Sequence, residues 1–550
     1  MSSVPAAALG PQGRLAAGAW RWGWWVALAA SIIAFSAYLQ AALGPRADLP
    51  TQVDEIFFLT CAVQGKAAGS LAPTGCHDNK GPAIFWLYET LVDLASPYRL
   101  APLKCVGAAI AVLNAALLGL LARRLFGPGA AILAFTMMLG SAAAESMFVT
   151  LKTEPLGLVF VLTSLVVLAG ARGVVSARRL LGIGVLFGVA LLAKQSYLFA
   201  LLGLLASALF WPAPCWPSAW LARVRSVFVL GLGVLIPFAM TLAWYQTQHR
   251  LSAVMASLFL YPSLYGDPAA PAASGAAQAF WKLVKLAEFS QPLALLMVLA
   301  LLGTVWAGWP TRPGENRDAA SARAALRPTI AVSLGLWLML VLSPTLFRYH
   351  LMPVLALAVV PASAGLLGLR RWLAVVPHAG LGLSLAVPVV ALVWVAAVLR
   401  GPGIRSETDR EFYDFQRFDT GGARYAYVQG MWPEFFVANG LIPASEVMYP
   451  NALPGTPSFW GFKLPPKGSP KALALARVNA DAAAQLMADF ARTPPAFIHV
   501  VDFVARAPGS QAVTDVPFLN EYLQSHCRPL KRIEKTVLHV GTLYACEDKR

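Results

Sequence analysis

The run GWWVALAASIIAFSAYLQAAL, Gly23 to Leu43, contains no charged residue. A stretch of this length and composition can cross the hydrocarbon core of a bilayer as a helix. After a short connection comes VDEIFFLTCAVQGKAAGSLAPTGCHDNKGPAIFWLYE, Val53 to Glu89, with two adjacent carboxylates and, further on, a lysine before Gly-Pro. The alternation of apolar runs with such polar stretches determines the fold. The function depends on which side of the membrane each polar stretch faces.

The composition predicts a polytopic α-helical membrane protein. The chain is 58% hydrophobic and 13% charged, whereas soluble domains carry about 25% charged residues. The formal charge of +16 raises the question of nucleic-acid binding. However, the basic residues form small clusters between long apolar runs, which is typical of a topology signal rather than of a binding stripe.

Apolar windows of about 17 to 25 residues predict roughly eleven membrane-spanning helices. They lie near residues 23–43, 103–122, 129–147, 155–171, 180–194, 196–211, 226–245, 291–309, 329–345, 350–369 and 380–400. The fifth and sixth windows are short and meet at Lys194, so this pair is either two helices or one long tilted helix. An odd number of spans places the two ends of the chain on opposite sides of the membrane.

Arginine pairs predict the orientation, because short cytoplasmic loops accumulate Lys and Arg. Such pairs follow alternate spans, at residues 123–124, 178–179 and 370–371. We therefore expect a cytoplasmic tail over residues 1–22, with the first span kept as an anchor in a bacterial inner (plasma) membrane. The first external loop, 44–102, then faces the periplasm, as does the tail of the chain.

The composition changes after residue 401, which predicts a membrane domain over 23–401 and a periplasmic domain over 402–550. KALALARVNADAAAQLMADFAR is typical of an amphipathic helix, whereas AFIHVVDF and TVLHVGTLYACE are typical of strands. The expected fold is thus a membrane domain with a small extracytoplasmic α/β domain at its C-terminus.

The cysteines divide by predicted location. Cys61 and Cys76 share the first external loop, and Cys527 and Cys546 share the external tail. An oxidising compartment permits disulfides there, so each pair forms either a disulfide or two buried thiols. The remaining two, in a span and in a cytoplasmic loop, are expected to be reduced.

Two adjacent carboxylates, Asp54 and Glu55, begin a segment with helical apolar spacing. We expect a short helix along the membrane surface with both acids in its first turn. One interpretation is that the acids only complement the helix dipole, and the other is that they are catalytic.

Lys80 immediately precedes Gly81-Pro82, a predicted helix start with proline at the first position. Backbone donors at a helix start attract negative charge, so a lysine there is unfavourable unless an anion is bound. Lys80 is therefore a candidate phosphate ligand; the alternative is a lysine that is solvated or reaches the headgroup level.

Further ionisable groups fall at other predicted ends of spans. Glu154 precedes Pro155, Arg348 and Tyr349 join the ninth span to the tenth, and Lys194 joins the fifth to the sixth. Ionisable groups at such depth are costly unless they are paired or line a polar cavity. We expect these acids and cations to gather around one pocket at the outer membrane boundary. We predict no metal site, because His77 with its neighbours Cys76 and Asp78 is the only candidate and adjacent residues seldom converge on one ion.

Five short motifs in this order resemble the GT-C class of membrane glycosyltransferases, specifically bacterial relatives of protein O-mannosyltransferase and aminoarabinose transferase. They are VDE after the first span, NKGPAIFW, TEP, LLAKQ and FRYHLMP. The resemblance covers residues 20 to 400 and identifies the membrane domain as a GT-C-like catalytic domain.

The resemblance implies an inverting transferase that moves a single sugar from a polyprenyl-phosphate carrier to an envelope acceptor at the periplasmic face. The acceptor would be lipid A, another part of lipopolysaccharide, a polysaccharide or a protein. Asp54 would be the general base, with Glu55 and Glu154 positioning hydroxyls. The donor phosphate would be bound by Lys80, Lys194, Arg348 and Tyr349, without a cofactor. The alternatives are a transporter or flippase for a lipid-linked saccharide and a non-enzymatic envelope assembly protein.

Overall fold

Two compact units make up the chain in the computed structural model, and each is assembled from three separate segments. The helical unit comprises Met1–Arg46, Lys104–Ala239 and Gly275–Ser406, and the α/β unit comprises Ala47–Leu103, Met240–Ser274 and Glu407–Arg550. The structure describes residues 11–43, 53–67, 80–95, 98–144, 149–171, 173–211, 213–260, 300–305, 317–343, 348–373, 418–429, 434–447, 468–501, 517–533 and 541–547, with a few isolated positions besides.

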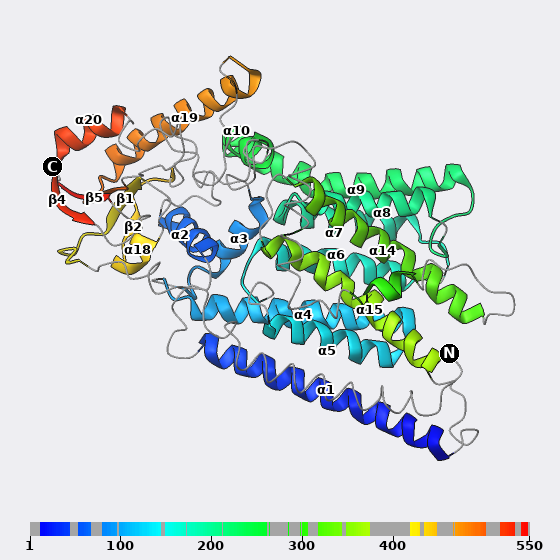
Figure 1. Cartoon of the computed structure of the whole chain (residues 1–550). Helices are drawn as coiled ribbons and strands as arrows, with labels where there is room; N and C mark the ends of the chain where they lie inside the picture. The colour runs from blue at the N-terminus through cyan, green and yellow to red at the C-terminus, as the bar shows by residue number, and fades with distance from the viewer. Residues whose placement is uncertain are drawn as a thin grey trace. The chain divides into compact units, whose positions relative to one another are not determined.

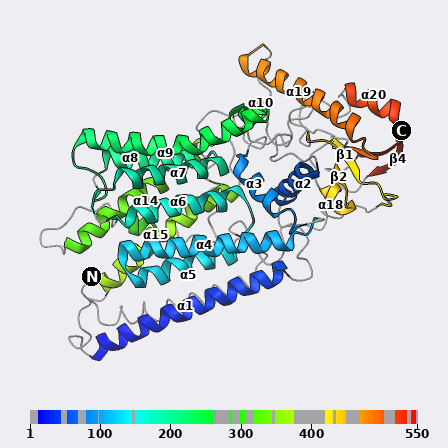
Figure 2. The same cartoon turned by 180° about the vertical axis from the view of Figure 1, so that it is seen from behind.

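Helices form the described part of the helical unit (Figures 1 and 2). They are α1 (Pro11–Leu43), α4 (Ala101–Phe126), α5 (Pro128–Ala144), α6 (Thr153–Ala169), α7 (Ala177–Ala193), α8 (Tyr197–Phe210), α9 (Trp220–Thr247), α14 (Arg317–Leu342) and α15 (Met352–Leu373). The first residues of α4 and the last residues of α9 belong to the α/β unit. The 3-10 turn η5 (Arg348–Leu351) leads into α15. Helix α1 packs along α5, α6 along α7, and α8 along α14.

Among the described residues, four helices are long and apolar enough to cross a membrane: those at Ala101–Phe126, Trp220–Thr247, Ala324–Leu342 and Tyr349–Leu366. Shorter apolar helices lie in α1, α5, α6 and α8. Residues 193 and 197 end and begin separate helices, so the predicted fifth and sixth windows are two helices that meet at Lys194. The predicted span at 380–400 lies outside the described residues, as does most of 291–309. The predicted number of eleven thus stays a prediction.

Glycines at the helix crossings let the backbone of one helix lie directly against the backbone of the next. A Cβ atom on Gly184 of α7 would lie 2.2 Å from the carbonyl oxygen of Leu230 in α9. In the same way, a Cβ on Gly203 of α8 would lie 2.1 Å from the carbonyl oxygen of Ala331 in α14. Small residues at such crossings are typical of helices packed within membranes.

A five-stranded mixed sheet, in the order β2-β1-β3-β5-β4, forms the centre of the α/β unit. Strand β1 (Tyr425–Gln429) is parallel to β2 (Ile442–Pro443) and β3 (Phe497–Val501), whereas β5 (Gly541–Cys546) is antiparallel to β3 and β4 (Cys527–Ile533). Strands β3 and β5 lie within the segments predicted as strands. The helices of this unit are α2 (Val53–Ala67), α3 (Pro82–Leu91), α10 (Leu251–Met255), the π-helical turn η3 (Ala256–Leu260), α18 (Glu434–Asn439), α19 (Pro470–Arg492) and α20 (Pro517–His526).

Helix α19 is the amphipathic helix predicted at 471–492. The hydroxyl of Ser469 caps its N-terminus by accepting a hydrogen bond from the backbone N–H of Ala472 at 3.2 Å. Its apolar face reaches the sheet through Phe490, whose ring lies 5.2 Å from that of Tyr427 in β1. Burial in this core raises the pKa of Tyr427.

The described residues of the segment 47–103 pack with the sheet rather than apart from it. Helix α2 contacts α18 and β2, and the hydroxyl of Tyr98 donates a 2.6 Å hydrogen bond to the carbonyl oxygen of Leu441. Residues 56 to 62 of α2 are almost fully buried, so other parts of the protein enclose this stretch of the helix. The expected position of α2 along the membrane surface stays a prediction. The sheet is therefore part of a larger unit that includes residues 47–103.

The disulfide between Cys527 and Cys546 is present, across paired positions of β4 and β5. Cys61 is also disulfide-bonded, while Cys76 lies outside the described residues. Cys105 and Cys215 are free thiols, as predicted.

Candidate active site

Glu154 and Lys194 form an ion pair at the ends of two packed helices. Glu154 lies in the first turn of α6 and Lys194 caps the end of α7. The Lys194 ammonium lies 3.0 Å from a carboxylate oxygen of Glu154, and the two side chains are 12% and 4% exposed. Because α6 and α7 pack along each other, the residues that the sequence placed at separate corners meet here.

Hydrogen bonds fix Glu154 from both sides. The hydroxyl of Tyr197, at the start of α8, donates to its backbone carbonyl at 2.5 Å, and Thr153 donates to its carboxylate at 2.9 Å. The side-chain amide of Asn114 donates to the carbonyl oxygen of Pro155, the next residue, at 3.0 Å. The carboxylate is thus held in one position, as a group that orients a substrate must be.

Tyr349 joins this cluster from η5. The Lys152 ammonium lies 4.3 Å from the centre of the Tyr349 ring, and the Lys194 ammonium lies 5.7 Å from it. The ring of His350 packs edge-on against Tyr349 at 4.7 Å. Two ammonium groups and one carboxylate therefore share this site, and the excess positive charge suits an anionic ligand.

Lys152 was not among the residues assigned a role from the sequence. It lies two positions before Glu154, in LKTEP, and is itself almost fully buried. A lysine in the same predicted corner as a candidate acid is the signal that could have identified it. Arg348 begins η5, but its side chain lies outside the described part of the structure.

The other predicted acids belong to the α/β unit. Asp54 and Glu55 lie in the first turn of α2, as predicted, and Glu55 is 2% exposed. The phenol of Tyr88, from α3, is buried against them. This burial, together with the charges of Glu55 and Asp54, raises the pKa of Tyr88 well above its usual value. Tyr88 is therefore a proton-bearing hydroxyl at any physiological pH.

Lys80 precedes α3, whose N-cap is Gly81 and whose first turn contains Pro82, as the sequence predicted. Its ammonium lies 5.7 Å from the centre of the Phe58 ring of α2. Its backbone carbonyl accepts a 3.1 Å hydrogen bond from the hydroxyl of Ser257 in η3. Two elements of the α/β unit thus contact Lys80: α2 contacts its side chain and η3 contacts its backbone.

The structure brings Glu154, Lys194 and Tyr349 together in the helical unit, and it places Asp54, Glu55 and Lys80 on neighbouring elements of the α/β unit. The gathering of all these residues around one pocket stays a prediction. In the described part of the chain, no group of three or more His, Cys, Asp or Glu side chains could hold a metal ion. His77 lies outside that part.

Apolar helices pack in pairs, and buried charges lie at their ends. This arrangement is typical of a multi-pass membrane protein with a polar site. Residues 79–244 match the family model described as dolichyl-phosphate-mannose-protein mannosyltransferase. The fold is similar to that of ArnT from Cupriavidus metallidurans bound to undecaprenyl phosphate, at 12% identity and a TM-score of 0.53, over 94% of this chain and 97% of that one. The apo state of ArnT matches at 13% identity and a TM-score of 0.53, over 95% and 98% of the two chains.

The oligosaccharyltransferase of Archaeoglobus fulgidus in the apo form matches less well, at 10% identity and a TM-score of 0.45, over 87% of this chain and 69% of that one. No curated protein matches at the level of sequence. The family match and the ArnT fold confirm the resemblance to GT-C membrane glycosyltransferases that the motifs predicted.

Proposed function

We propose that this protein is an inverting glycosyltransferase that moves a single sugar from a polyprenyl-phosphate carrier to an acceptor of the cell envelope. The observation that carries the proposal is the buried cluster of Lys152, Lys194 and Tyr349 around Glu154, in a chain with the fold of a protein whose structure holds undecaprenyl phosphate. The cluster supplies fixed positive charge, which a site for a lipid phosphate requires.

The chemistry of the donor explains these residue types. A phosphate group has a second pKa near 6 and therefore leaves as a stable anion at neutral pH without a general acid. The site must instead stabilise the negative charge that grows on the leaving phosphate. Each well-placed donor is worth about 2.7 to 4 kcal/mol in comparable oxyanion sites. We assign this role to Lys80, Lys194, Arg348 and Tyr349.

In the proposed reaction the acceptor hydroxyl oxygen forms a bond to the anomeric carbon. The bond from that carbon to the phosphate oxygen breaks on the opposite face, and its electron pair leaves with the polyprenyl phosphate. The proton of the acceptor hydroxyl passes to the carboxylate of Asp54 as general base. Glu55 and Glu154 position sugar or acceptor hydroxyls. Because fixed cations bind the phosphate, the proposal requires neither a metal nor a cofactor.

The proposal places the reaction at the periplasmic face of a bacterial inner membrane, with the N-terminus in the cytoplasm and residues 402–550 in the periplasm. The candidate acceptors are lipid A, another part of lipopolysaccharide, a polysaccharide and a protein.

Mass spectrometry of envelope glycolipids and glycans from a deletion strain tests this function. We expect one component to lose the mass of a single sugar, which names both the sugar and the acceptor. Restoration by the wild-type gene, but not by an Asp54→Asn gene expressed at the same level, would assign the loss to catalysis. An unchanged set of envelope sugars would contradict the proposal.

A further inference from the structure

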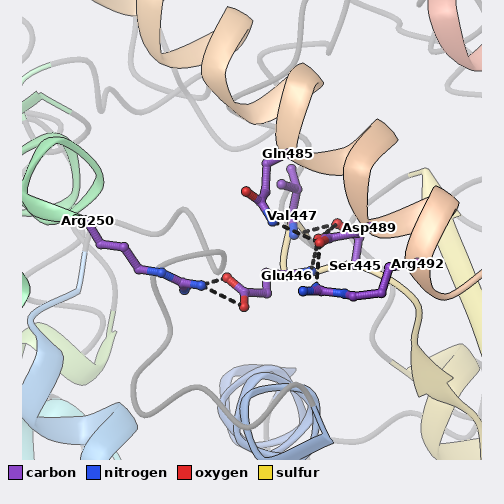
Figure 3. A network of polar contacts seen from close by, with 7 residues as sticks. All are labelled: Arg250, Ser445, Glu446, Val447, Gln485, Asp489 and Arg492. Carbon is purple, nitrogen blue, oxygen red and sulfur yellow. Dashed lines mark hydrogen bonds and ion pairs between the residues drawn. The ribbon is translucent and has the colours of Figure 1, made fainter. Parts of the chain in front are cut away.

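Arg250 and Glu446 form a paired ionic contact between distant parts of the α/β unit (Figure 3). Two guanidinium nitrogens of Arg250 lie 2.5 and 2.9 Å from the two carboxylate oxygens of Glu446. Arg250 follows α9 and Glu446 follows β2, 196 positions later. The side chains are 29% and 6% exposed, so the carboxylate is buried and the guanidinium is partly buried. The two-point geometry fixes the direction of the contact as well as its distance.

A second carboxylate holds the backbone around Glu446. Asp489 of α19 is almost fully buried and accepts hydrogen bonds from the hydroxyl of Ser445 at 2.8 Å and from the backbone N–H of Glu446 at 3.0 Å. It also accepts from Gln485 and Arg492, each at 2.8 Å (Figure 3). The carboxylate of Glu446 therefore projects from a segment that is tied to α19.

Residues 251–257, which follow Arg250, connect this ion pair to Lys80. Helix α10 and the π-helical turn η3 follow directly, and Ala256 of η3 is buried in the core that contains Tyr427 and Phe490. The next residue, Ser257, donates its hydroxyl to the carbonyl oxygen of Lys80 at 3.1 Å. π-Helical turns are rare and occur frequently at functional sites.

We infer that Arg250, Glu446 and Ser257 are positioning residues that couple the C-terminal sheet to the phosphate-binding lysine. This inference rests on the proposed function of Lys80. The stem of a lysine has a fixed length, so the region that its ammonium can reach depends on where its backbone is held. The Arg250–Glu446 contact holds α10 and η3 to the sheet, and Ser257 holds the backbone of Lys80 to η3. Through these contacts the C-terminal sheet helps to position Lys80 for donor binding.

The kinetic test uses the purified full-length protein with a polyprenyl-phosphate sugar as the varied substrate. Ser257→Ala is expected to raise KM for the donor about 2- to 10-fold, the range that corresponds to one hydrogen bond. In a Lys80→Ala background the same change should have no further effect, because Ser257 acts through Lys80. If the increases in donor KM caused by the two substitutions multiplied in the double variant, the inference would be overturned.

The ion pair has a control on helix α19, outside the network. Arg250→Ala should raise KM for the donor at least as much as Ser257→Ala, whereas Arg477→Ala removes an exposed arginine of α19 and should leave KM unchanged. The double variant Arg250→Glu with Glu446→Arg exchanges the two charges. Its KM for the donor should be closer to that of the wild type than the KM of either single charge-reversal variant. Equal effects of Arg250→Ala and Arg477→Ala would contradict the proposed coupling.

Hydrogen exchange separates this inference from the proposed function. In Ser257→Ala and Arg250→Ala, the amides of α3 should exchange faster than in the wild type and in Arg477→Ala, whether or not the protein transfers sugar. Unchanged exchange of α3 in both variants would overturn the coupling. Faster exchange of α3 in these two variants, together with a wild-type protein that uses no polyprenyl-phosphate donor, would keep the coupling and reject the proposed function.

Discussion

Two adjacent carboxylates at the start of α2 have different surroundings, and this difference supports different roles. Glu55 is almost fully buried and lies by the phenol of Tyr88, whereas Asp54 is only partly buried. A general base must reach the proton of an incoming hydroxyl, so Asp54 is the better candidate. Glu55 suits the role of a fixed hydrogen-bond acceptor.

Replacing Asp54 by Asn should abolish sugar transfer while the protein still folds and inserts. The amide keeps the size of the side chain but cannot accept the proton, and loss of general base catalysis typically lowers the rate about 10²- to 10⁴-fold. Turnover of the purified variant measures the effect, with Asp93→Asn as control, since Asp93 is an exposed carboxylate paired with Lys66 in the same unit. Retained turnover would remove Asp54 from the role of base.

Replacing Lys80 by Ala should weaken the use of the donor more than the use of the acceptor. The ammonium is assigned to the donor phosphate, so KM for the polyprenyl-phosphate sugar should rise about tenfold or more, as for the loss of one charged hydrogen bond. Lys66→Ala, at an exposed position of α2, is the matched control. An unchanged dependence of rate on donor concentration would count against the phosphate assignment.

Replacing Lys194 by Met should destabilise the protein, because it leaves the buried carboxylate of Glu154 without its closest cation. Removing one partner of a buried pair typically costs about 3 to 5 kcal/mol. The double variant Lys194→Met with Glu154→Gln should recover part of that loss. Thermal unfolding in detergent compares the three proteins, and a single variant as stable as the wild type would show that the pair is not important for stability.

At the scale of single elements, the sequence predicted most of what local patterns control. Apolar windows indicated the helices from α4 to α9, the Gly81-Pro82 start of α3 was correct, and the amphipathic pattern at 471–492 indicated α19. These features depend on residues that are close in the chain. The burial of α2 was not predicted, because it depends on α18 and β2, which lie hundreds of residues away in the chain.

The crossing of α7 and α9 offers a prediction with a control on the same helix. Gly184→Ala would place a Cβ 2.2 Å from the carbonyl oxygen of Leu230, so the helices must separate. Overpacking of this kind typically costs about 1 to 3 kcal/mol. Gly182, two residues earlier, has open space around its Cβ position, so Gly182→Ala should be neutral or stabilising by about 0.4 to 1 kcal/mol. Thermal unfolding distinguishes them, and equal stability of both variants would contradict this packing.

At the scale of the whole molecule, the sequence could not predict how distant segments combine. The α/β unit joins residues 47–103, 240–274 and 407–550, and the contacts that hold it include Tyr98 with Leu441 and Arg250 with Glu446. Such pairs leave no periodic signal in the chain. The site was predicted in part for the same reason: motifs at helix ends indicated Glu154, Lys194 and Tyr349, whereas Lys152 was found only through its contact with Tyr349.

Turnover of a labelled donor tests the central claim most directly. Purified wild-type protein is incubated in lipid with a polyprenyl phosphate that carries a labelled sugar and with an envelope extract as acceptor, and the carrier is analysed by mass spectrometry. We expect bare polyprenyl phosphate to accumulate as the label moves to the acceptor, and Asp54→Asn to produce neither product. A carrier that keeps its sugar in the presence of folded protein, even if it crosses the bilayer, would rule out the proposed transfer and favour a transporter.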